Sequence, residues 1–240
     1  ETQLKGERLK TDLIENVSHD IKTPLTSIIN YVDILDRENF EDERIAGYVD
    51  ILVRKSARLK QLTDDLIEAS KISSGNITLD MQDINLIQLI KQTNGEFEEK
   101  FEARHLQLVC TLPEENLMIR ADGRRMYRVL ENLYNNASKY AMPYSRVYVD
   151  GENQDDKVIF SIKNMSEHPL NISADELMER FVRGDSSRTT EGNGLGLEIA
   201  RNLTVMQNGK FDLYLDGDLF KVVIIFGEKE EKPEKEEEAA

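Results

Sequence analysis

The chain has 240 residues and a formal charge of −15, from 46 acidic and 31 basic residues. That charge repels nucleic acid and anionic lipid, so we expect no nucleic-acid partner, and any phosphate-bearing ligand needs a local cationic pocket. The single cysteine, Cys110, excludes a disulfide framework within the chain and a zinc site built from several thiolates. The length is ample for a hydrophobic core and favours two domains.

The amino-terminal part is patterned as two long helices. Apolar residues recur every seven positions in two runs, which are Ile14, Ile21, Ile28 and Leu35, then Ile45, Leu52, Leu59 and Leu66. This spacing predicts an antiparallel helical hairpin over residues 1–73, joined by the polar stretch "RENFEDE". A single hairpin exposes most of its apolar stripe, so we expect two copies to pair as a homodimer with a four-helix bundle.

A different pattern begins after the hairpin. The segment "KISSGN", residues 71–76, carries helix stop signals, and residues 74–80 are interpreted as a linker. The next domain, residues 81–227, is expected to be α+β, with one sheet covered by helices. The expected strands are 77–81, which begins in the linker, then 106–111, 118–121, 146–151, 157–163 and two near the end. The expected helices are 86–104, 124–140, 175–181 and 195–206. The charged tail, residues 228–240, is predicted to be disordered.

The segment "NVSHDIKTPLTS", residues 16–27, places His19 opposite the expected helical seam, facing water. Pro24 lacks an N–H and its ring crowds the carbonyl of Asp20, which predicts a bend that gives a partner room to approach. A neutral imidazole keeps one lone pair and can act as a nucleophile, while Asp20 can accept a hydrogen bond from the other ring nitrogen. Thr23 lies one helical turn on. The alternative is an ordinary surface histidine.

A second polar cluster lies in "ENLYNNASKY", residues 131–140. Asn132, Asn136 and Lys139 follow at spacings of four and three, so one helix face presents two amides and an ammonium. Amide oxygens suit Mg²⁺ and an ammonium suits phosphate. The alternative is a polar face on a helix that packs in the core.

A glycine-rich segment, "GNGLGLEIA" at residues 192–200, places Gly192, Gly194 and Gly196 before an amphipathic helix. Glycines let the backbone approach an anion, and free N–H groups at a helix amino end favour phosphate, although ordinary turns use the same residues. Just upstream, "LMERFVRGDSSR" supplies Arg183 and Arg188, whose guanidinium groups suit phosphoryl charge. Solvated charges on a loop are the alternative interpretation of these arginines.

These segments, in this order, resemble the sensor histidine kinases of two-component systems. "SHDIKTPLTSI" is similar to the family's phosphoacceptor motif, "NLYNNASKY" to its asparagine motif and "GNGLGL" to its second glycine motif. The resemblance implies that His19 is the phosphorylated residue and Asp20 its acid–base partner. It also implies that Thr23 supports phosphatase activity toward the partner regulator.

The same resemblance predicts a site for ATP and Mg²⁺ in an α/β sandwich domain of the histidine kinase and Hsp90-like type. It assigns the metal to Asn136, phosphate-side contacts to Asn132 and Lys139, and the edge of the adenine pocket to Tyr140. Asn164 stands where the family usually carries the aspartate that binds the exocyclic amine of adenine. An amide oxygen still accepts from that amine, but without charge and therefore more weakly.

The resemblance also implies a lid over the triphosphate, formed by the three glycines, with Arg183 and Arg188 near the transferring phosphoryl group. His105 and His168 have no metal-ligand partner at useful spacing, so we expect both to be structural or surface residues.

The resulting prediction is an ATP-dependent protein histidine kinase that phosphorylates His19 and passes the phosphoryl group to an aspartate of a response-regulator receiver domain. The resemblance also implies that the chain is the cytoplasmic part of a membrane-anchored bacterial protein whose upstream segments are missing. One alternative is a regulator-docking scaffold or phosphatase with weak nucleotide binding. Another is an ATPase resembling Hsp90 and MutL, but those proteins carry a water-activating glutamate where this chain has Asn132, and an amide cannot serve as general base.

Overall fold

The computed structural model describes residues 24–38, 40, 42–75, 77–183 and 195–227. The chain divides into two compact units, of which the first comprises residues 1–78 with 179–199 and the second residues 79–178 with 200–240. Helices α5 (Ala174–Arg183) and α6 (Leu195–Met206) each span a point of division.

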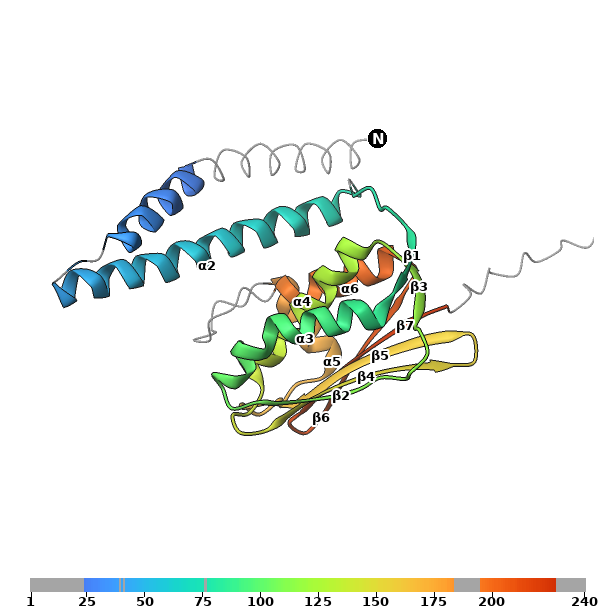
Figure 1. Ribbon diagram of the computed structural model, residues 1–240. Helices are drawn as coiled ribbons and strands as arrows, with labels where there is room; N and C mark the ends of the chain where they lie inside the picture. Colours follow the sequence, from blue (N-terminus) through green and yellow to red (C-terminus); the bar gives the residue numbers. More distant parts are fainter. Residues whose placement is uncertain (1–23, 39, 41, 76, 184–194, 228–240) are drawn as a thin grey trace, which may run out of the picture. The chain divides into compact units, whose positions relative to one another are not determined.

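The first unit contains the predicted helical hairpin (Figure 1). Residues 24–37 are helical, and the second helix, α2, spans Glu43–Ser73. The Asp42 side chain caps α2 by accepting a hydrogen bond from the Arg44 N–H at 2.9 Å. At the other end, Gly75 has φ +69° and its N–H donates to the Ile72 carbonyl, so a residue that tolerates a left-handed backbone ends the helix. The hairpin and its stop signal are confirmed, whereas the bend predicted around Pro24 involves residues outside the described part.

The apolar stripe of this hairpin is uncovered within one chain. Six described members of the two seven-residue runs are 39–53% exposed, namely Ile28, Leu35, Ile45, Leu52, Leu59 and Leu66. The row that is buried on α2 has the same spacing and contains Val49, Ser56 and Thr63. The two hydroxyls in that row donate to carbonyls of their own helix, those of Val53 and Leu59, at 3.0 and 2.9 Å.

The second unit is built on two sheets, so the expectation of a single sheet was wrong. The larger sheet has the strand order β2-β4-β5-β7-β6. Its strands are β2 (Gln107–Thr111), β4 (Arg146–Gln154), β5 (Lys157–Met165), β6 (Lys210–Asp216) and β7 (Leu219–Phe226). Only the β2–β4 pair is parallel within this sheet. The smaller sheet pairs β1 (Gln82–Asn85) with β3 (Met118–Ala121).

The first strand lies later than predicted, at residues 82–85 rather than 77–81. The register explains this difference, because Gln82 pairs with Ala121, the last residue of β3. The next residue, Asp122, is already the amino cap of helix α4. Met81 and the residues before it therefore have no strand residue opposite them.

Helices α3 (Leu86–Glu102) and α4 (Gly123–Tyr140) lie over the same face of the larger sheet (Figure 1). Alternate residues of β5 and β7 are buried and face each other across the ladder, such as Phe160 with Ile224 and Ile162 with Val222. This period of two defines the inner face of the sheet. On α4, Met126, Leu130 and Leu133 are at most 1% exposed.

The amino end of α4 is held by the buried carboxylate of Asp122. Its Oδ1 accepts from the N–H groups of Arg124 and Arg125 at 3.0 and 3.1 Å, and its Oδ2 accepts from the Asp80 N–H at 3.0 Å. The Asp122 N–H donates to Gln207 Oε1 at 2.9 Å. Burial alone would raise the pKa of Asp122, but these backbone donors and the Arg125 guanidinium outweigh it and hold the pKa below its usual value.

We expect Asp122→Ala to lower the free energy of unfolding of the second unit by about 1–2 kcal/mol, because α4 loses its cap. The pKa of Asp122 is lower in the folded state, so the ionised carboxylate stabilises the fold at pH values above 3.8, its ordinary pKa. This contribution is lost as the pH falls through the pKa of the folded state. Urea unfolding between pH 7 and pH 2.5 measures both effects. Asp122→Asn is the matched control, because asparagine also caps helices but does not titrate. If Asp122→Asn lost as much free energy of unfolding at low pH as the wild type, that loss would come from another titrating group.

Candidate nucleotide site

Helix α4 carries four of the predicted site residues on its carboxyl-terminal half. Asn132 is 7% exposed, Asn136 and Tyr140 are half-buried, and Lys139 is exposed. The helix is continuous from Gly123 to Tyr140, so the predicted spacing does place these residues along one side. The Nδ2 atom of Asn132 is buried and has no hydrogen-bond partner among the described residues. Leaving a buried donor unpaired costs about 1–3 kcal/mol, so this amide is prepared for an acceptor that the described residues do not supply.

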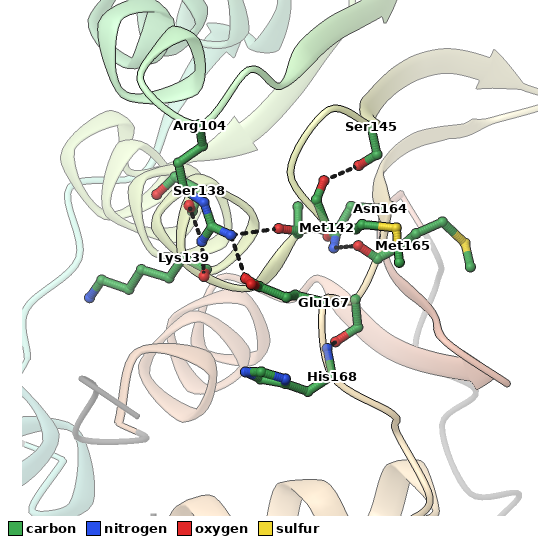
Figure 2. A network of polar contacts seen from close by, with 11 residues as sticks. Arg104, Ser138, Lys139, Met142, Ser145, Asn164, Met165, Glu167 and His168 are labelled. Atoms are coloured by element: carbon green, nitrogen blue, oxygen red, sulfur yellow. Dashed lines mark hydrogen bonds and ion pairs between the residues drawn. The ribbon is translucent and has the colours of Figure 1, made fainter. Parts of the chain in front are cut away.

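The fifth predicted residue, Asn164, lies near the end of strand β5. It is 2% exposed and belongs to the inner-face row that otherwise contains Val158, Phe160 and Ile162. Its Nδ2 donates to the Met165 carbonyl at 3.1 Å, while its buried Oδ1 has no partner in the described part of the chain (Figure 2). A polar amide in an apolar row, with an acceptor left unpaired, indicates a site for a hydrogen-bond donor.

The end of α4 and the end of β5 are fastened to each other through the backbone. The Met142 N–H donates to the Met165 carbonyl, and the Glu167 N–H donates to the Tyr140 carbonyl, both at 2.8 Å. Asn164 on the strand and Tyr140 on the helix are therefore brought to the same end of the second unit.

A further side chain, not found by sequence reasoning, completes this junction. The Arg104 guanidinium donates from Nη1 to the carbonyls of Ser138 and Lys139, and from Nη2 to the Ala141 carbonyl at 3.0 Å and the Glu167 carboxylate at 2.5 Å (Figure 2). Three separate segments meet at this one side chain. No local signal marks it, because nothing in the spacing relates residue 104 to residues 138–141 and 167. Asp122, in contrast, lies two residues before the predicted helix start at residue 124 and is a residue type preferred as an N-cap.

The described residues contain no group of three or more His, Cys, Asp and Glu side chains placed to hold a metal ion. A divalent cation at this site would be held by an amide oxygen, such as that of Asn136, and by oxygens of a bound phosphate group. Mg²⁺ accepts such an arrangement, since it commonly binds through one or two protein groups and substrate phosphates.

The remaining predicted residues are not tested by the structure. His19, Asp20, Thr23, Arg188, Gly192 and Gly194 lie outside the described residues. Helix α5 extends to Arg183, whose side chain is not among those described, and Gly196 is half-buried in the first turn of α6.

The other two histidines have structural contacts. The His105 ring stacks on the Tyr144 ring, with centroids 4.5 Å apart, and the backbone N–H of His168 donates to Ser166 Oγ at 3.3 Å.

Comparison with known families identifies the family to which the chain belongs. Residues 9–75 match the family model described as "His Kinase A (phospho-acceptor) domain", and residues 121–237 match "Histidine kinase-, DNA gyrase B-, and HSP90-like ATPase". The chain belongs to the sensor histidine kinases. The family predicted from the three motifs is therefore confirmed.

Two named relatives illustrate how much of a sensor kinase the chain represents. It is 34% identical over 208 residues to "Sensor protein VanS" of Enterococcus faecium, covering 85% of this chain and 54% of the relative. It is 26% identical over 219 residues to "Sensor histidine kinase WalK" of Bacillus subtilis (strain 168), covering 89% of this chain and 35% of the relative. The chain thus spans about half the length of VanS and about a third of WalK.

Solved structures share the fold of this kinase. Full-length ShkA in complex with AMPPNP aligns with a TM-score of 0.75 at 20% identity, over 90% of this chain and 45% of ShkA. ThkA in complex with the response regulator protein TrrA aligns with a TM-score of 0.63 at 24% identity, over 93% of this chain and 64% of that chain. The predicted α+β class, a helical amino-terminal part followed by an α/β domain, is confirmed.

We expect Asn164→Leu to leave the free energy of unfolding of the kinase unchanged or slightly higher. The substitution removes a buried oxygen that has no partner among the described residues, and the Met165 carbonyl still accepts from the Met142 N–H. Urea unfolding measures this, with Asn164→Asp as a control that buries a charge and should destabilise at pH 7. A loss of more than about 2 kcal/mol in Asn164→Leu would show that the amide has a partner or a packing role.

Proposed function

We propose that this chain is the catalytic portion of a sensor kinase that binds ATP with Mg²⁺, phosphorylates His19 and passes the phosphoryl group to an aspartate of a response regulator. The observation that carries the proposal is the pair of buried amide atoms without partners among the described residues, Asn132 Nδ2 and Asn164 Oδ1. One is a donor and one an acceptor, and they lie at the positions that the family resemblance assigns to the phosphate side and the adenine.

The residues of the second unit have distinct roles in nucleotide binding under this proposal. Asn164 Oδ1 accepts from the exocyclic amine of adenine, and Tyr140 lines the edge of that pocket. Asn132 and Lys139 contact the phosphate side, and Asn136 holds the metal. Bound Mg²⁺ would supply positive charge that offsets the charge of the phosphate oxygens. The ShkA structure with AMPPNP, a triphosphate analogue, supports a nucleotide in this fold.

The transfer step requires a nucleophile that the first unit carries. One ring nitrogen of His19 uses its lone pair to form a bond to the γ-phosphorus, while the bond from that phosphorus to the bridging oxygen breaks and ADP leaves with the electron pair. Asp20 accepts a hydrogen bond from the other ring nitrogen and stabilises the positive charge that develops on the imidazole.

The lid segment completes the proposed site. Arg183 and Arg188 offset negative charge on the transferring phosphoryl group, and Gly192, Gly194 and Gly196 allow the backbone to approach the triphosphate.

The proposed partners follow from the same assignments. A receiver-domain aspartate takes the phosphoryl group from His19, and Thr23 assists its removal from the regulator. The ThkA complex with the response regulator protein TrrA supports a regulator as partner. None of the described helices is long and apolar enough to cross a bilayer.

Incubation with γ-labelled ATP and Mg²⁺ should place an acid-labile phosphoryl group on the wild-type chain and none on His19→Gln. Asn136→Ala should also remain unlabelled, because the metal would lose its protein ligand. Autoradiography after electrophoresis at neutral pH measures the label. A wild-type chain that stays unlabelled while binding a regulator would favour the scaffold alternative. Rapid ATP turnover without phosphoprotein would favour the ATPase alternative.

Dimerisation through the hairpin is the second part of the proposal, supported by the exposed apolar stripe on α2. We expect the wild-type chain to sediment at twice its chain mass and the double variant Leu52→Asp/Leu59→Asp as a monomer, because burying two carboxylates in a seam is unfavourable. Lys60→Ala, at an exposed position of the same helix, is the control and should stay dimeric. A monomeric wild type would contradict this part.

A further inference from the structure

The Arg104 guanidinium has an unusual set of acceptors for a side chain in a loop. It follows the end of α3, yet it bonds three carbonyls at the end of α4 and the carboxylate of Glu167, two residues beyond β5. Its side chain is 27% exposed and that of Glu167 is 41% exposed, so the pair is partly shielded from solvent.

The chemistry of this contact favours arginine specifically. The last carbonyls of a helix lack intrahelical partners and carry partial negative charge. A guanidinium presents five N–H donors in a fixed plane, so one side chain can satisfy several carbonyls and a carboxylate at once. A lysine ammonium is a point charge without that fixed geometry.

The position of this contact relates it to the nucleotide site. The Lys139 carbonyl accepts from Arg104, and the Tyr140 carbonyl accepts from the N–H of Glu167. Asn164 lies three residues before Glu167 on the same strand and turn. The two halves of the proposed site, on α4 and on β5, are therefore joined at this end through Arg104 and Glu167 (Figure 2).

We propose that Arg104 and Glu167 are positioning residues that fix the spacing between the α4 half and the β5 half of the nucleotide site. This inference rests on the proposed nucleotide binding. Because Nη1 and Nη2 of Arg104 donate to protein acceptors, its loss weakens binding of the nucleotide and leaves the transfer step itself intact. A purely structural helix cap would instead lower the melting temperature without changing nucleotide affinity.

The test compares Arg104→Met, Arg104→Lys and Glu167→Gln with a control, Arg120→Met, whose ion pair with Asp83 on the smaller sheet is exposed. We expect Arg104→Met to raise the Kd for Mg²⁺–AMPPNP and the KM for ATP about tenfold, with kcat changed less than about threefold. Arg104→Lys should recover part of the affinity, and Arg120→Met should match the wild type. Glu167→Gln keeps the shape of the side chain and removes its charge, so it should raise the Kd and the KM less than Arg104→Met does. It tests the same contact in case Arg104→Met does not fold. Calorimetry and initial rates of labelling measure these values.

Amide hydrogen exchange gives a readout that needs no nucleotide. Loss of the Arg104 contact should speed exchange at Glu167 and Met142 and leave strand β7 unchanged. An unchanged Kd with a lowered melting temperature would overturn the inference. A wild-type chain that binds no nucleotide would overturn the proposed function. Unchanged exchange in Arg104→Met would by itself overturn the positioning role, whether or not the wild type binds nucleotide.

Discussion

Both ends of helix α4 are held by ionised side chains, and the arrangement of the site depends on that constraint. Asp122 binds the free N–H groups at the amino end, and Arg104 binds the carbonyls at the carboxyl end. Each charge has the sign that the helix dipole favours. The same two side chains also bind residues outside the helix, Asp80 and Glu167, so they fix α4 relative to the segment before β1 and the loop after β5.

A helix fixed in this way can carry buried polar groups whose hydrogen bonds are not made within the fold. Asn132 and Asn164 are buried polar residues in otherwise apolar surroundings, and each leaves one amide atom without a partner among the residues described. Most buried polar groups in folded proteins are hydrogen-bonded, so two exceptions in the described residues, both at positions proposed to bind the nucleotide, are informative. The stability lost there is offset by the apolar packing of α4 against the sheet, and departures from local rules of this kind are typical of functional sites.

The sequence predicts some parts of this structure well, because their signals are local. The spacing of Asn132, Asn136 and Lys139 locates them on one helix face, and glycine and serine at residues 73–75 predict the end of α2. Strand pairing depends on distant residues and was predicted less well. Residues 77–81 have enough apolar character for a strand, but the turn of the chain at Asp122 limits the pairing to residues 82–85. Arg104 was missed for the same reason, since its acceptors lie more than thirty residues away.

The parallel pairing of β2 with β4 bears on how this molecule folds. Parallel neighbours cannot be joined by a tight turn, and the connection between these two strands contains β3 and the whole of α4. Helix α4, which bears four of the proposed nucleotide-site residues, thus lies in the crossover that joins two neighbouring strands of the sheet. The pairing of β2 with β4 and the placement of those four residues consequently depend on the same crossover, and such long-range pairing slows folding relative to a simple hairpin.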